Sequence, residues 1–99
     1  MTNADFFRQA LSGLEVNEQY SQAVIGLQDR SRLCFHHAVG ERWVKALPEE
    51  MAPSMARDLL PAIARFRLNA KHLEIVFADA TRWEMPFRDQ RSQTQATRW

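Results

Sequence analysis

The sequence has few of the features that mark secreted, disulfide-stabilised or membrane-spanning chains. It has one cysteine, Cys34, so no disulfide can form within the chain, which is typical of proteins in a reducing compartment. No apolar run approaches the roughly 20 residues that cross a bilayer. The first residues, MTNADFF, lack the basic start and apolar stretch of a secretory signal. We therefore expect a small cytoplasmic protein without membrane contact.

Catalytic signatures are also missing. The sequence has no nucleophile elbow, phosphate-binding glycine loop, dinucleotide fingerprint or metalloprotease helix. The acidic residues are scattered, apart from Glu49 and Glu50, whose place at an expected helix start explains them. A chain of 99 residues also has little core from which to form a ligand pocket. We expect a non-enzymatic protein that holds no cofactor.

The charge balance gives little general attraction to nucleic acid. Thirteen basic and twelve acidic residues leave a net charge of +1, whereas affinity for phosphate backbones depends on many cationic contacts. All but two of the basic residues are arginine, which binds carboxylates and phosphates with a planar fork. Compositional bias of the source genome is the simpler explanation of this excess, so an Arg-mediated nucleic-acid or phosphate binder is the alternative function.

Two stretches, residues 23–39 and 73–87, repeat one pattern at a spacing of 50 positions. Apolar residues alternate on both sides of an Asp-x-Ser/Thr turn, as in half-buried strands joined by a tight reversal. The matched pairs are Ile25 and Ile75, Leu27 and Phe77, Asp29 and Asp79, Ser31 and Thr81, Arg32 and Arg82, Leu33 and Trp83, and Phe35 and Met85. The repeat predicts two β-hairpins, with helix as the rival interpretation.

Neither hairpin has glycine at its tip, where the residues are Arg30 and Ala80. Two-residue hairpin turns favour glycine there, so loops of three to five residues are expected. The predicted inward residues are Ile25, Leu27, Leu33, Phe35, Ile75, Phe77, Trp83 and Met85. The predicted outward residues are Val24, Gly26, Gln28, Arg32, Cys34, His36, Glu74, Val76, Ala78, Arg82 and Glu84.

Apolar spacings of three and four residues predict a helix over residues 5–14 and a second helical stretch reaching residue 67. Pro48 or Ser54 could begin the second one, and Pro61 should kink or divide it. The intervening segment 41–47 fits helix or strand, and we favour an extended conformation.

These elements predict a two-layer α+β domain over residues 1–87. Tandem αββ units would form one largely antiparallel four-stranded sheet with both helices on one face. Residues 88–99 are polar and are expected to form a mobile tail.

Cys34 and His36 share one strand face and are weak candidates for metal ligands. A closed structural site needs four ligands, and the chain has no second cysteine and one histidine, His72, outside this stretch. We therefore predict no metal site.

An outward sheet face is the expected contact surface. Trp43 lies between charged neighbours and is the candidate anchor, with Val24, Val76, Arg32 and Arg82 as further interaction residues. Trp43 capping the end of the core is an equal alternative. Because exposed strand edges can pair with another chain, we predict a protein-interaction module that binds a protein partner or forms a homodimer.

Overall fold

The computed structural model, which describes residues 1–49 and 53–87, is an α+β fold built from two antiparallel sheets. The first sheet contains β1 (Leu11–Val16), β2 (Gln22–Leu27), β3 (Arg32–Ala38) and β4 (Glu41–Leu47), in chain order. The second contains β5 (Ile63–Leu68), β6 (His72–Phe77) and β7 (Arg82–Pro86). The helical elements are α1 (Asn3–Ala10), α2 (Met55–Leu59) and the 3₁₀ turn η1 (Leu60–Ala62).

Both predicted hairpins are confirmed. β2 pairs with β3 and β6 pairs with β7, across loops 28–31 and 78–81 that fall within the expected length. The tip residues Arg30 and Ala80 both adopt the left-handed conformation, with φ of 73° and 72°. The extended conformation favoured for residues 41–47 is also confirmed, because this segment is β4.

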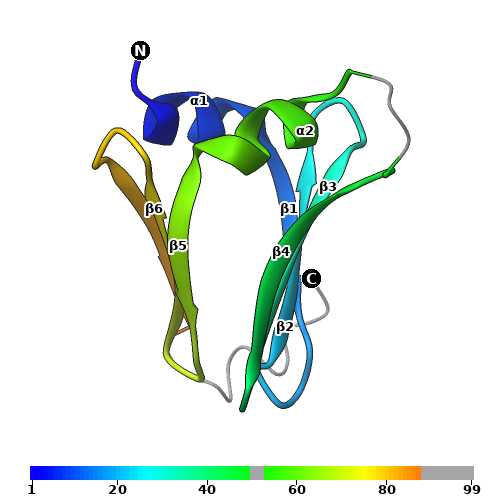
Figure 1. Ribbon diagram of the computed structural model, residues 1–99, viewed down its shortest axis with the longest axis vertical. Helices are drawn as coiled ribbons and strands as arrows, with labels where there is room; N and C mark the ends of the chain where they lie inside the picture. The colour runs from blue at the N-terminus through cyan, green and yellow to red at the C-terminus, as the bar shows by residue number, and fades with distance from the viewer. Residues whose placement is uncertain (50–52, 88–99) are drawn as a thin grey trace.

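The prediction that the two hairpins share one sheet was wrong. They lie in different sheets, which stand as two facing walls, and the helices lie across one end of both walls instead of covering one face (Figure 1). Each hairpin therefore buries its apolar face largely against the other sheet, as well as against the helices. A facing sheet buries alternating apolar residues as well as a layer of helices does, so the sequence pattern did not distinguish the two arrangements.

Two strands, β1 and β5, were wrongly predicted as the ends of helices. Each contains a bulge near its start, where the register shifts between Leu11 and Gly13 and between Ile63 and Arg65. A bulge adds one residue and so changes the spacing of inward side chains locally from two to three. The resulting apolar series imitates helical periodicity. The two series are Leu11, Leu14 and Val16, and Ile63, Phe66 and Leu68.

The second helix is shorter than expected, although the predicted cap at Ser54 is confirmed. The Ser54 side chain accepts a hydrogen bond from the Arg57 N–H at 3.1 Å. Pro61 lies in the following 3₁₀ turn, and its lack of an N–H prevents an α-helix from continuing through it. The alternative start at Pro48 concerns a segment that includes residues 50–52, and the predicted tail 88–99 also lies outside the described residues.

The structural repeat is larger than the hairpin. A helical element and three strands occur twice, with Ala4 matching Ala56 and Phe7 matching Leu59 at a spacing of 52. The β1–β2 turn covers residues 17–21, whereas the β5–β6 turn covers only 69–71. Because this turn is two residues shorter, matching residues lie 50 positions apart in the hairpins and not 52. The match at a spacing of 50 therefore covers the hairpins alone.

The hairpin loop of each repeat caps the helix of the other repeat. Asp29 accepts a hydrogen bond from the Met55 N–H at 2.8 Å, and Ser31 accepts one from the Ala56 N–H at 3.1 Å. At the matching positions, Asp79 accepts from the Asn3 N–H at 2.9 Å and Thr81 from the Ala4 N–H at 3.2 Å. These bonds satisfy N–H groups that have no partner within the helix. The two repeats are thus bound to each other by the same pair of contacts, made in both directions.

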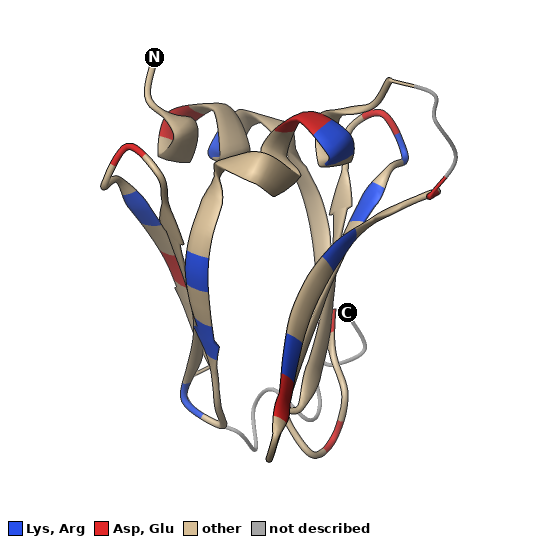
Figure 2. Ribbon diagram, in the orientation of Figure 1, with Lys and Arg blue, Asp and Glu red and all other residues tan. Residues whose placement is uncertain are grey.

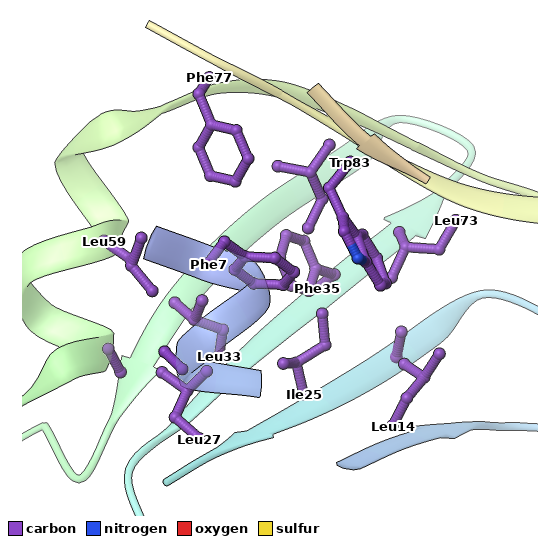
Figure 3. Packing of buried hydrophobic residues seen from close by; sticks show 14 of the residues in the cluster. Phe7, Leu14, Ile25, Leu27, Leu33, Phe35, Leu59, Leu73, Phe77 and Trp83 are labelled. Carbon is purple, nitrogen blue, oxygen red and sulfur yellow. The ribbon is translucent and has the colours of Figure 1, made fainter. Parts of the chain in front are cut away.

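Aromatic side chains from both repeats meet in a shared core (Figure 3). The ring of Phe7 in α1 lies 5.7 Å from that of Phe77 and 4.9 Å from that of Trp83. Phe35 in β3 contacts Phe66 in β5, with ring centroids 5.1 Å apart. Because these pairs cross from one repeat to the other, the core belongs to both sheets together.

Candidate functional site

The outer edge of β4 is an open strand edge. β4 pairs with β3 along its whole length, from Arg32 opposite Leu47 to Ala38 opposite Glu41. On its other side, β4 has no strand neighbour and no backbone hydrogen-bond partner among the described residues. Such a row of free N–H and C=O groups can pair with a strand from another chain.

Three outward side chains of β4 form a connected row next to this edge. The Trp43 Nε1–H donates a hydrogen bond to Glu41 Oε2 at 3.0 Å, and Lys45 Nζ lies 5.0 Å from the centre of the Trp43 ring. On the neighbouring strand, the His36 ring stacks on Trp43 at 5.0 Å with an interplanar angle of 11°. The indole is therefore held in one orientation while part of its surface stays accessible. We call Glu41, Trp43 and Lys45 the β4 row.

A groove of about 500 Å³ lies between β4 and β5. Arg42 crosses it, donating a hydrogen bond to the Phe66 carbonyl at 3.2 Å while its guanidinium lies 5.8 Å from the Phe66 ring centre. Val44 and Ile63 add apolar surface. Basic residues lie on both strands that border the groove (Figure 2).

The groove carries unneutralised positive charge. Within the part of the chain that the structure describes, Arg42, Arg65 and Arg67 form no ion pair. The acidic residue in the lining, Glu74, is bound to Arg82 outside the groove at 2.9 Å. A carboxylate or phosphate that entered the groove would therefore meet guanidinium groups that have no ion-pair partner among the described residues.

The five predicted interaction residues do not lie on one surface. Val24 and Arg32 share a shallow depression on the outer face of the first sheet, whereas Val76 belongs to the second sheet, where it borders the groove with Trp43. Arg82 is also on the second sheet, paired in register with Val76. Arg32 and Arg82 occupy matching positions in the two hairpins but lie in different sheets. Asp29 and Asp79, in the loops next to these arginines, cap helices: their carboxylates accept the Met55 and Asn3 N–H groups.

Cys34 and His36 share an outward face, as predicted, but both side chains pack against other residues. Neighbouring side chains cover Cys34, whose exposure is 6%, and this burial raises the pKa of its thiol. His36 Nε2 lies 3.8 Å from Glu41 and its ring stacks on Trp43. No group of three or more histidine, cysteine, aspartate or glutamate side chains in residues 1–49 and 53–87 is arranged to hold a metal ion.

The lowered pKa values of three aspartates reflect capping. Hydrogen bonds from the Ser31 hydroxyl and the Met55 N–H lower the pKa of Asp29. The Asn3 N–H and the Thr81 hydroxyl do the same for Asp79. The side chain and backbone of Thr2 lower the pKa of Asp5, which closes a capping box at α1. None of these carboxylates lines the groove, so their shifts indicate structural roles.

No protein-family model matches the sequence, and comparisons with curated proteins and with solved structures found no match either. The function must therefore be inferred from the molecule itself. Among the described residues, no helix is long and apolar enough to span a membrane.

Sequence reasoning found Trp43 but missed the groove beside it. The groove depends on β5, which we had assigned to a helix, and on Arg42 reaching across from β4. A usable signal was present: the Ile63, Phe66 and Leu68 series follows Pro61, which makes a continuing helix unfavourable and a bulged strand a better interpretation.

Proposed function

We propose that this chain is a small, cytoplasmic, non-enzymatic protein-interaction module that self-associates through its open β4 edge. The observation that carries the proposal is the combination of free backbone groups along β4 with the half-buried Trp43 beside them. Tryptophan is enriched at the centres of protein interfaces, because it buries a large surface and loses little conformational entropy. Its present contacts hold the ring in place before a partner arrives.

Several observations favour a binding role over catalysis. The groove is lined by apolar and arginine side chains, together with Glu74. The lowered aspartate pKa values are explained by helix capping, and the raised one at Cys34 by burial. Catalytic sites, in contrast, bring groups with perturbed pKa values together in one cleft.

Sedimentation equilibrium of the full chain, from about 1 µM to 1 mM, tests the proposal over the range of weak to moderate association. We expect a reversible dimer that weakens by about tenfold or more in Trp43→Ala, the scale of an interface anchor. Val24→Ala is the matched control, since this residue is also half-buried and outward but lies on β2. A wild-type chain that stays monomeric throughout would overturn self-association. Unchanged association and stability in Trp43→Ala would remove Trp43 as the anchor.

The second candidate is an Arg-mediated nucleic-acid or phosphate binder, favoured by the three arginines of the groove that lack ion pairs among the described residues. Binding of a single-stranded oligonucleotide should then fall steeply with added salt. The reversal pair Arg65→Glu and Arg67→Glu should abolish it. Dimerisation should change much less over the same salt range.

A further inference from the structure

The β4 row is self-complementary in antiparallel pairing. Resting on the self-association proposed above, we infer that β4 of one chain pairs with β4 of a second copy about a two-fold axis at Trp43. Glu41 of each copy then lies opposite Lys45 of the other. The occupant of the open edge is thus a second copy of this chain, and the pairing extends the four-stranded sheet across the dimer.

Symmetry restricts how two identical edges can meet. A closed dimer places the same surface of both chains in contact, and a two-fold axis perpendicular to the sheet makes the two β4 strands antiparallel. Residues directly opposite each other in an antiparallel pair lie on the same face of the sheet. The outward β4 row must therefore face the outward row of the second copy.

Charge then selects one register. With the axis at Trp43, Glu41 meets Lys45 twice, and Arg42 meets Val44 on the inner face. An axis at Glu41, Arg42 or Lys45 would place each of these side chains opposite its own copy, and like charges directly opposite are unfavourable. An axis at Val44 avoids repulsion but leaves Glu41 opposite Leu47, without an ionic partner. Among registers centred within β4, the Trp43 register is the one that matches oppositely charged β4 residues in both symmetric halves.

The turn before β4 carries exposed apolar surface. Val39, in the turn before β4, is 103% exposed and is one of two exposed large hydrophobic residues among those described. In the Trp43 register, Leu47 of the second copy extends past Glu41, at the end of the sheet where this turn lies.

Charge reversal tests this register directly. Glu41→Lys or Lys45→Glu alone places like charges opposite each other at two symmetric positions, so each variant should dimerise about tenfold or more weakly than wild type. The double variant E41K/K45E restores opposite charges and should regain wild-type association. An equimolar mixture of the two single variants should form a mixed dimer, because each copy then presents the charge that the other lacks.

Glu18→Lys and Lys71→Glu are matched controls, since both residues are exposed in turns away from β4 and give the same changes in net charge. These controls should dimerise like wild type, and their mixture should gain no preference for the mixed dimer. Sedimentation equilibrium measures association, and circular dichroism verifies that each variant is folded. If one single variant does not fold, the double variant and the other single variant still test the register.

The possible outcomes separate the two proposals. A wild-type dimer that neither single reversal weakens would overturn the register and leave self-association standing. A wild-type chain that is monomeric at every concentration would overturn the proposed function itself. Weakening by both single reversals, with rescue in the double variant and in the mixture but not in the controls, supports the register.

Discussion

At the residue scale, the tips of the two hairpin loops both adopt an unfavourable backbone conformation. Arg30 and Ala80 occupy matching loop positions and both have positive φ. For residues other than glycine this conformation costs about 1–2 kcal/mol. The hydrogen bonds of the adjacent Asp29 and Asp79 hold both loops in this conformation, so the cost is offset by the caps that the loops provide.

Replacing Ala80 with glycine should stabilise the protein. The substitution relieves the left-handed strain but adds flexibility to the unfolded chain, so we expect a net gain of up to about 1 kcal/mol. Ala78→Gly is the matched control: Ala78 is exposed in the same loop without positive φ, and the change should cost about 0.4–1 kcal/mol. Urea unfolding of both variants measures the difference. Equal losses of stability in the two would contradict the prediction.

The capping aspartates should make stability depend on pH below neutrality. The pKa values of Asp29 and Asp79 are lowered in the folded protein from an ordinary value of 3.8. The unfolded state therefore takes up protons first, and the stability that these carboxylates contribute is present above about pH 5 and is lost as the pH falls through 3.8 and below. Thermal unfolding of Asp29→Asn and Asp79→Asn from pH 7 to pH 2.5 should show a lower midpoint at pH 7 and a smaller decrease at low pH than wild type. Glu18→Gln is the control on an exposed turn, and a decrease as steep as that of wild type in both Asp variants would exclude the aspartates as the cause.

At the scale of elements, the sequence predicts strands well where alternation is regular and fails where a bulge interrupts it. The two hairpins and the strand 41–47 were predicted, because their inward residues follow a spacing of two. β1 and β5 were not, because the bulges between Leu11 and Gly13 and between Ile63 and Arg65 change the local spacing to three. The error was systematic: a bulge at the same point in both repeats gave the same false helix.

The candidate site was predictable only as far as it lies on one strand. Trp43 stood out from its charged neighbours, and its outward position on an extended segment is what the structure shows. The opposing strand β5, and with it the groove, depends on how two sheets face each other. Register within a hairpin is local, whereas the facing of two sheets is decided by packing between residues far apart in sequence, such as Phe35 and Phe66.

At the scale of the whole molecule, each repeat completes the other. Phe7 belongs to the first repeat, but its ring contacts Phe77 and Trp83 of the second. The helix caps likewise cross between repeats in both directions. Separating the repeats would expose both the apolar faces and the helix N–H groups, so neither repeat retains a complete core of its own.

Because core contacts and helix caps cross between the repeats, the two sheets should unfold together. Hydrogen exchange of the β2 and β6 amides should report the same free energy of global unfolding, since the core that protects them is shared. Phe7→Ala should lower both values by about 3–5 kcal/mol, the usual cost of removing a buried phenylalanine. The ring contacts of Phe7 are with β6 and β7 in the second sheet. An equal loss of protection in β2 would therefore show that the first sheet depends on the same core.

Phe6→Ala is the neighbouring control, since Phe6 is only half-buried and its loss should lower both values by less. Phe7→Leu is the milder variant for conditions in which Phe7→Ala does not fold. If Phe7→Ala lowered protection in β6 while β2 kept its wild-type value, the first sheet would be stable without the second. The molecule would then be two separate folding units, and the exchanged caps would only hold them side by side.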